Sequence, residues 1–328
     1  MAETHEQSGE APKRKKSDFW IRLMTGTVYM LVLIGFFMLK IFVDTFLFDF
    51  LVLAFAVLGT FEMLRAFKDK LHISQIVLVM TFSVLTLITF SVSDFIYIEV
   101  LDSRVHGTSN YTPLITFVTF ITGLSVVLGL LVFAHEKVSL ESTGYALLSY
   151  IYPTVFLLVL AGCNHLEKYS EVAVLFIFAI CPFSDSLALV FGKAFGKKLP
   201  AKMAPHVSPN KTLIGGFGGL VGGALGAVLV YFVYYGFAKP AAGIDGATFA
   251  TVAFDWTDMI FFVGIGVIAA FFSQFGDLVE SAIKRKLGIK DMGKLLPGHG
   301  GILDRIDSSL YAGLIICLIF TLRIMITL

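Results

Sequence analysis

The chain has 328 residues, of which 57% are hydrophobic and 15% charged, and its net charge is +1. Soluble domains are closer to half apolar and a quarter charged, so a soluble fold of this length could not bury so much apolar surface. The balanced charge provides no basic field for nucleic acid, and we expect no nucleic-acid partner. Cys163, Cys181 and Cys317 lie in or beside apolar runs and form no CxxC pair, so they imply neither a disulfide framework nor a zinc site.

Residues 1–19 are largely polar, and we predict that they form a disordered cytoplasmic tail. Four consecutive basic residues, Lys13 to Lys16, precede a long apolar run. A signal peptide would have a short apolar core and a cleavage site of small residues, whereas this run is long and further apolar runs follow it. We therefore predict an uncleaved first membrane helix.

Nine apolar runs are each long enough for a helix of about 20 residues, the length that crosses the hydrocarbon core of a bilayer. The fold class predicted is all-α, a polytopic membrane protein with about nine transmembrane helices. Residues 20–171 would form N-terminal transmembrane helices, and residues 172–328 a catalytic transmembrane region with two cytoplasmic loops. The predicted spans are residues 23–41, 46–64, 74–93, 112–134, 143–162, 172–192, 213–236, 258–276 and 308–327.

The basic residues are distributed unevenly between alternate loops. With the N-terminus in the cytoplasm, 20 of the 25 lysines and arginines fall in cytoplasmic segments, which agrees with the positive-inside rule. The two long basic loops, residues 193–212 and 284–305, then both face the cytoplasm, and we expect the chemistry there. Because the tail is short, we expect a bacterial inner membrane rather than an endoplasmic reticulum.

Glycines recur at a spacing of four in the seventh span, in two rows that begin at Gly215 and Gly218. Small residues at this spacing let helix backbones approach closely. A phosphate-binding P-loop would carry its Lys-Thr pair after the glycines, whereas Lys211 and Thr212 precede them. The run predicts helix packing, which would also suit a homodimer.

The segment between the last two spans places carboxylates at two helix ends. Asp277, Glu280 and Lys284 are spaced by three and four, so they share a face if the eighth helix continues beyond the membrane. Asp304 and Asp307 share a face where the last helix begins. Carboxylate oxygens suit Mg²⁺, which takes one or two carboxylates together with substrate phosphates. The pattern predicts a site for a metal and a phosphate.

The loop between these helix ends is rich in basic residues and glycine. Gly300 and Gly301 would let backbone N–H groups approach a phosphate, and His299 is a candidate base or phosphate donor, or else an ordinary solvated histidine. An ordinary juxtamembrane loop would also be basic, but Asp277 and Asp304 are harder to explain in this way, since a carboxylate beside a span is costly unless paired or liganded. The candidate phosphate-binding cations are Lys284, Arg285, Lys290 and Arg305.

A second group of candidates begins inside the sixth span with Asp185, an ionisable residue at membrane depth. The alternative for Asp185 is a carboxylate hydrogen-bonded to a neighbouring serine or helix. The loop that follows ends in Ser208, Pro209, Lys211 and Thr212, where Pro209 prevents a helix and Thr212 would begin the next span. Lys211 and Ser208 are candidate phosphate contacts, although a lysine loop could serve topology alone.

The run from Ser281 to Asp307 resembles the signature of phosphatidate cytidylyltransferases, also called CDP-diacylglycerol synthases. The motif positions are filled at the expected spacing throughout. They are Ser281-Ala282-Ile283-Lys284-Arg285, Lys290-Asp291, Gly293, Leu296-Pro297, His299-Gly300-Gly301-Ile302 and Asp304-Arg305-Ile306-Asp307.

The upstream segment is similar to a second motif of the family but departs from it at three positions. The family has Tyr where this chain has Leu189, Arg where it has Lys193, and Glu where it has Ile214. The change at Ile214 removes a polar group and bears on the cytidine or lipid contacts of that loop. The matching positions are Asp185, Ala188, Gly192, Gly196, Lys197, Ser208-Pro209, Lys211-Thr212, Gly215 and Gly218-Gly219.

The resemblance implies transfer of the cytidylyl group of CTP to phosphatidate at the bilayer surface, giving CDP-diacylglycerol and pyrophosphate, with Mg²⁺ and a possible second cation. Asp277 and Asp304 would ligate the metal, with Asp307 and Asp185 as further candidates. His299, Gly300 and Gly301 would shape the triphosphate loop. Lys284, Arg285, Lys290, Arg305 and Lys211 would bind phosphates, and Ser208 and Thr212 would bind phosphate or orient Lys211.

Three other functions stay open at this point. A CTP-dependent polyisoprenol or dolichol kinase would release CDP instead of pyrophosphate. A transporter would use Asp185 as a coupling carboxylate, but it would require an inverted repeat that the sequence does not display. An inactive scaffold of the same family would fit the change at Ile214, although the charged signature residues argue against it.

Overall fold

The computed structural model describes residues 13–97, 110–243, 246 and 254–327. Within them, nine helices are long and apolar enough to cross a membrane, as predicted. The N-terminal group is α1 (Lys13–Phe42), α2 (Phe46–Ala66), the short η1 (Lys68–Lys70), α3 (Ile73–Phe95), α4 (Thr112–Phe133) and α5 (Leu140–Asn164). The C-terminal group is α6 (Ser170–Phe195), β1 (Lys202–Ala204), β2 (Ser208–Thr212), α7 (Leu213–Val233), the π-helical η3 (Tyr234–Ala238), α8 (Lys239–Ala241), α9 (Trp256–Lys286) and α10 (Leu303–Thr327).

Two helix ends and one loop differ from the prediction. Helix α9 continues past the predicted span end near residue 276 to Lys286, the condition under which Asp277, Glu280 and Lys284 share a face, and an i,i+4 ion pair between Glu280 and Lys284 supports this extension. Helix α10 begins at Leu303, five residues earlier than predicted. The fold is not purely helical, since β1 and β2 form an antiparallel hairpin in which Lys202 pairs with Thr212. The predicted tail overlaps α1, which begins at Lys13, and residues 1–12 lie outside the described part.

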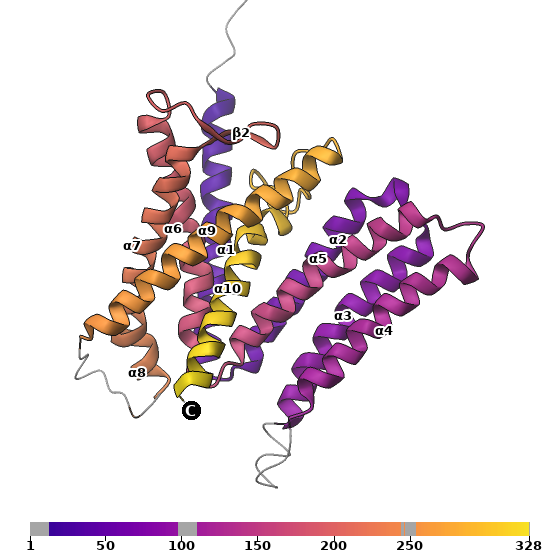
Figure 1. Cartoon of the computed structure of the whole chain (residues 1–328), viewed down its shortest axis with the longest axis horizontal. Helices are drawn as coiled ribbons and strands as arrows, with labels where there is room; N and C mark the ends of the chain where they lie inside the picture. Colours follow the sequence, from indigo (N-terminus) through magenta and orange to yellow (C-terminus); the bar gives the residue numbers. More distant parts are fainter. Residues whose placement is uncertain (1–12, 98–109, 244–245, 247–253, 328) are drawn as a thin grey trace, which may run out of the picture.

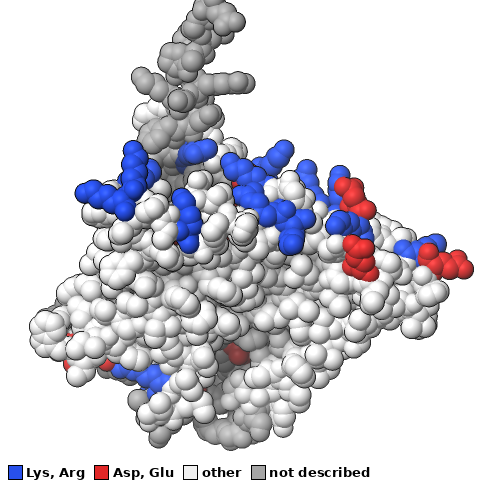
Figure 2. Space-filling model, turned by 45° about the horizontal axis from the view of Figure 1, so that its top comes forward, with Lys and Arg blue, Asp and Glu red and all other residues white. Residues whose placement is uncertain are grey.

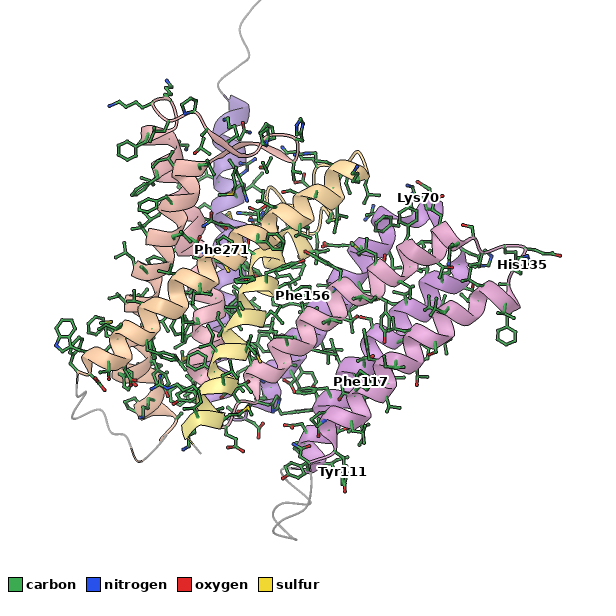
Figure 3. The ribbon with its side chains drawn as sticks, viewed as in Figure 1. Lys70, Tyr111, Phe117, His135, Phe156 and Phe271 are labelled. Atoms are coloured by element: carbon green, nitrogen blue, oxygen red, sulfur yellow. The ribbon has the colours of Figure 1, made fainter. Side chains whose placement is uncertain are left out.

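The helices are arranged in two groups that lie side by side (Figure 1). Helices α2 to α5 form one group, and α1 lies with α6, α7, α9 and α10 in the other. Helix α5 joins the groups by packing on α10, and Phe156 of α5 reaches across so that its ring centroid lies 4.5 Å from that of Tyr311 (Figure 3). The hairpin and the start of α10 lie at the same end of the second group.

The two glycine rows of α7 pack against helices of the same chain. A methyl group at Gly218 or Gly222 would collide with α6 at Phe191 or Phe183, and one at Gly223 would collide with α9 at Gly266. The close approach predicted from the small-residue spacing is therefore confirmed. Because α6 and α9 occupy both rows, a second copy of the chain would have to bind elsewhere.

Lysine and arginine side chains gather along one rim of the molecule, above a broad band of uncharged residues (Figure 2). The basic rim includes the hairpin and the segment between α9 and α10, so the two sequence regions with candidate residues lie at one end of the bundle.

Candidate active site

A polar cavity of about 370 Å³ lies where α1, α6, α9 and α10 meet. It brings together seven of the candidate residues from sequence segments that lie far apart. Helix α1 contributes Thr25, Gly26 and Tyr29, which the sequence analysis did not single out. The candidates on its wall are Asp185, Asp277, Lys284, His299, Asp304, Arg305 and Asp307.

Lys211 is joined to the cavity wall by an ion pair with Asp277, although it does not itself line the cavity. Strand β2 presents Lys211, and Thr212, directly after it, caps α7 by accepting a hydrogen bond of 3.1 Å from the backbone N–H of Gly215. The other oxygen of Asp277 accepts from the Ser281 hydroxyl at 3.3 Å. The hairpin thus brings Lys211, from the second group of candidates, into contact with Asp277 of the first group.

Lys284 lines the cavity and lies between two carboxylates, Asp304 on the same wall and Glu280 behind it. Its Nζ is 2.7 Å from Oε2 of Glu280 and 2.8 Å from Oδ1 of Asp304. The side chain of Glu280 is fully buried and that of Lys284 is 12% exposed. A buried carboxylate requires a paired cation, so Lys284 neutralises the carboxylates of Glu280 and Asp304.

Asp304 organises the loop before α10. Its Oδ2 accepts hydrogen bonds from the backbone N–H groups of Met292 at 2.9 Å and Gly301 at 2.8 Å, with Gly293 further away at 3.4 Å. Both carboxylate oxygens of Asp304 therefore already accept hydrogen bonds from groups of the protein. The Gly301 N–H that was a candidate phosphate donor is likewise used, since it points to Asp304.

Besides Asp304, four carboxylates line the cavity, Asp185, Asp277, Asp291 and Asp307, and all but Asp291 were predicted as cation ligands. Among the described residues, no group of three or more His, Cys, Asp and Glu side chains lies close enough to hold a metal ion alone. Mg²⁺ in phosphate-processing sites takes only one or two carboxylates and completes its shell with water and substrate phosphates. The hard oxygen donors on this wall fit that pattern.

His299 is held by α1 rather than free in solvent. Its Nδ1 lies 2.7 Å from the Thr25 hydroxyl, and the imidazole lies beside Gly26 of the helix. Partial burial, followed by the positive charges of Arg305 and Arg22, lowers the pKa of His299 below its usual value. The lowered pKa favours the neutral ring at neutral pH, and the imidazole lines the cavity.

Several candidates lie outside the cavity lining. Arg285 is exposed and donates to the backbone oxygens of Val207 at 3.3 Å and Ile289 at 3.4 Å, so it ties the hairpin to the end of α9. Lys290 is exposed on the loop. Gly300 has φ +86°, a left-handed conformation that favours glycine, and its carbonyl accepts from Leu296 at 2.8 Å. Ser208, Thr212 and Gly301 also do not line the cavity.

An apolar groove of about 370 Å³ adjoins the polar cavity between α1, α6 and α7. Met30, Leu33, Phe178 and Pro182 line both spaces. The groove continues along the membrane-spanning parts of the helices to Phe237. A molecule with a charged head and apolar chains could therefore occupy both spaces at once.

The chain matches one protein family over most of its length and individual relatives over about half of it. The cytidylyltransferase family profile matches residues 24–323. A phosphatidate cytidylyltransferase of Helicobacter pylori is 38% identical over 169 residues, 52% of this chain and 54% of that protein. One of Staphylococcus epidermidis is 34% identical over 187 residues, 57% and 62% of the two chains. One of Staphylococcus aureus is 37% identical over 139 residues, which are 42% of this chain and 45% of that protein. These alignments span about half of each relative's length.

Proposed function

The chain belongs to the cytidylyltransferase family, and on that premise we propose that it transfers the cytidylyl group of CTP to phosphatidate, giving CDP-diacylglycerol and pyrophosphate. The observation that carries the proposal is the junction between the polar cavity and the apolar groove. CTP is polar throughout, whereas phosphatidate joins an anionic head to two acyl chains. A polar cavity that opens sideways onto an apolar groove suits a reaction between these substrates.

The proposed orientation places the N-terminus and the cavity on the cytoplasmic side of a bacterial inner membrane. The basic rim in Figure 2 supports it, because cytoplasmic loops carry an excess of lysine and arginine. CTP is available on that side. The bacterial sources of the three relatives support a bacterial membrane.

In the proposed reaction, a phosphate oxygen of phosphatidate forms a bond to the α-phosphorus of CTP. The bond between that phosphorus and the oxygen that bridges to the β-phosphate breaks, and its electron pair leaves on pyrophosphate. Both reactants are anions, so positive charge must lie between them. Arg305 is exposed on the cavity wall, and Lys211 reaches the wall through Asp277. We assign to both the binding of phosphate oxygens.

Magnesium, when bound, would screen the phosphates and stabilise the charge that develops on pyrophosphate. Asp277, Asp307 and Asp185 would hold it, and they have enough oxygens for a second cation. Asp304 would instead keep the loop in place. His299 would donate or accept a hydrogen bond at a phosphate while Thr25 fixes its ring.

The test uses the purified full-length chain in detergent with CTP labelled at the α-phosphate, phosphatidate and Mg²⁺. We expect labelled CDP-diacylglycerol and an equal molar amount of unlabelled pyrophosphate. Release of labelled CDP with phosphorylation of the lipid would instead indicate a CTP-dependent lipid kinase. Lys198→Gln, a change of an exposed lysine on the same loop as Lys211, should retain activity and serves as the control.

A further inference from the structure

The carboxylate of Glu62 crosses from α2 to the start of α10. Its Oε1 accepts a hydrogen bond from the backbone N–H of Ile302 at 3.0 Å, and its Oε2 accepts one from Leu303 at 2.8 Å. Glu62 is only 4% exposed and does not line the polar cavity. A buried carboxylate is costly unless it is hydrogen-bonded, so both oxygens are used for this contact.

The start of α10 needs such a partner because its own sequence supplies none. The first N–H groups of a helix have no intrahelical acceptor and are usually satisfied by a Ser, Thr, Asp or Asn side chain. Here the preceding residues are Gly300, Gly301 and Ile302, which have no acceptor side chain. Asp304 in the first turn faces back to the loop amides. Glu62 therefore acts as a cap from another helix, and its charge also suits the helix N-terminus.

Two glycines leave the space that Glu62 occupies. A methyl group built at either Gly293 or Gly301 would collide with the Glu62 carboxylate. Neither glycine has a positive φ, so the need for glycine here is one of space rather than backbone conformation. This contact accounts for Gly301 without a bound phosphate.

We infer that Glu62 is a positioning residue for the reaction proposed above, acting through α10. The first two turns of α10 carry Asp304, Arg305 and Asp307, all on the cavity wall. Misplacement of reacting groups by about 1 Å can cost about 100-fold in rate. By fixing the helix start, Glu62 sets where these three side chains lie. The inference rests on the proposed function for its kinetic readout.

The test compares Glu62→Gln with Asp49→Asn, a change of a second buried carboxylate at the opposite end of the same helix. Glutamine keeps one acceptor but directs an amide N–H toward the other backbone N–H. We expect faster hydrogen exchange of the Ile302 and Leu303 amides in Glu62→Gln and a fall in kcat of tenfold or more per folded molecule. Asp49→Asn should lower the melting temperature yet keep kcat within about twofold of the wild type.

A double-mutant cycle tests the mechanism independently. Gly301→Ala should lower kcat in the wild-type background by displacing Glu62. In a Glu62→Ala background, where the space is vacated, the fold-decrease in kcat caused by Gly301→Ala should be at least fivefold smaller. If Glu62→Ala does not fold, Glu62→Gln and Gly301→Ala remain informative. Unchanged amide exchange and a kcat within twofold of the wild type in Glu62→Gln would overturn the inference. An inactive wild type would count against the proposed function alone, because amide exchange still tests the contact.

Discussion

Lys211 of β2 and Asp277 of α9 form an ion pair across 66 residues of sequence. The two side chains are 29% and 27% exposed, so the pair is open to ligands. A triphosphate that draws Lys211 away would free the Asp277 oxygens for a cation. In the proposed reaction the pair would therefore link the binding of an anion to the binding of a cation.

The first prediction concerns this pair. Asp277→Asn and Lys211→Gln should each lower CDP-diacylglycerol formation by about 100-fold, because oriented charges at phosphoryl transfer sites contribute on that scale. The rate should be measured across a Mg²⁺ titration, in which Asp277→Asn is expected to remain slow at saturating metal. Near wild-type turnover of Asp277→Asn throughout the titration would remove Asp277 from the cation site. Lys198→Gln is the control.

The second prediction concerns Lys284, the shared partner of Glu280 and Asp304. Lys284→Met should destabilise the protein by about 3–5 kcal/mol, the usual cost of leaving a buried charge without its partner. The measurement is thermal unfolding in detergent at constant pH. Lys286→Met, a change of an exposed lysine one half-turn away, should leave the melting temperature unchanged. Equal melting temperatures for both variants would contradict the pairing.

Local sequence spacing was sufficient to predict the elements that carry the site. Nine spans followed from hydropathy, and Asp277, Lys284, Asp304 and Asp307 were assigned to two helix ends from intervals of three and four. These predictions succeed because a helix places residues at such intervals on one face. The hairpin was not predicted, since Pro209 and strands of three and five residues provide almost no periodic signal.

Contacts between distant segments could not be predicted in this way. Thr25 at His299 and Glu62 at Ile302 join residues more than 200 positions apart, and their local sequence does not identify the partner. A polar Thr25-Gly26-Thr27 run in the first span was the available signal for the first contact. For Glu62, the signal was a carboxylate within a membrane span, which is costly unless it has a buried partner.

The third prediction concerns His165, at the bundle end opposite the polar cavity. Its Nε2 lies 2.9 Å from Asp49 of α2 and its Nδ1 lies 2.7 Å from Asp94 of α3, while Lys40 and Glu171 form a second buried pair nearby. Burial lowers the pKa of His165, but the hydrogen bonds to the two aspartates outweigh it and raise the pKa from 6.5 to about 9. The charged imidazole thus joins three helix ends.

Because the folded pKa lies above the unfolded value, the stabilisation is fully present below pH 6.5 and is lost as the pH rises through 9. We expect the melting temperature to fall across this interval by an amount corresponding to on the order of 3 kcal/mol. In His165→Gln the fall over the same interval should be much smaller. A wild-type profile that matches the variant would show that His165 is not charged in the folded protein.

The fourth prediction concerns the apolar groove. Ala179 lines it on α6, so Ala179→Phe should fill the space where we propose that an acyl chain lies. The variant should lose at least tenfold in kcat/KM with dioleoyl phosphatidate but less than threefold with dihexanoyl phosphatidate, whose chains are too short to extend along the groove. Leu225→Phe enlarges an exposed residue of α7 outside the groove and should affect neither substrate. Equal losses with both lipids would mean that Ala179→Phe disturbs α6 itself, because a groove that holds acyl chains must discriminate by their length.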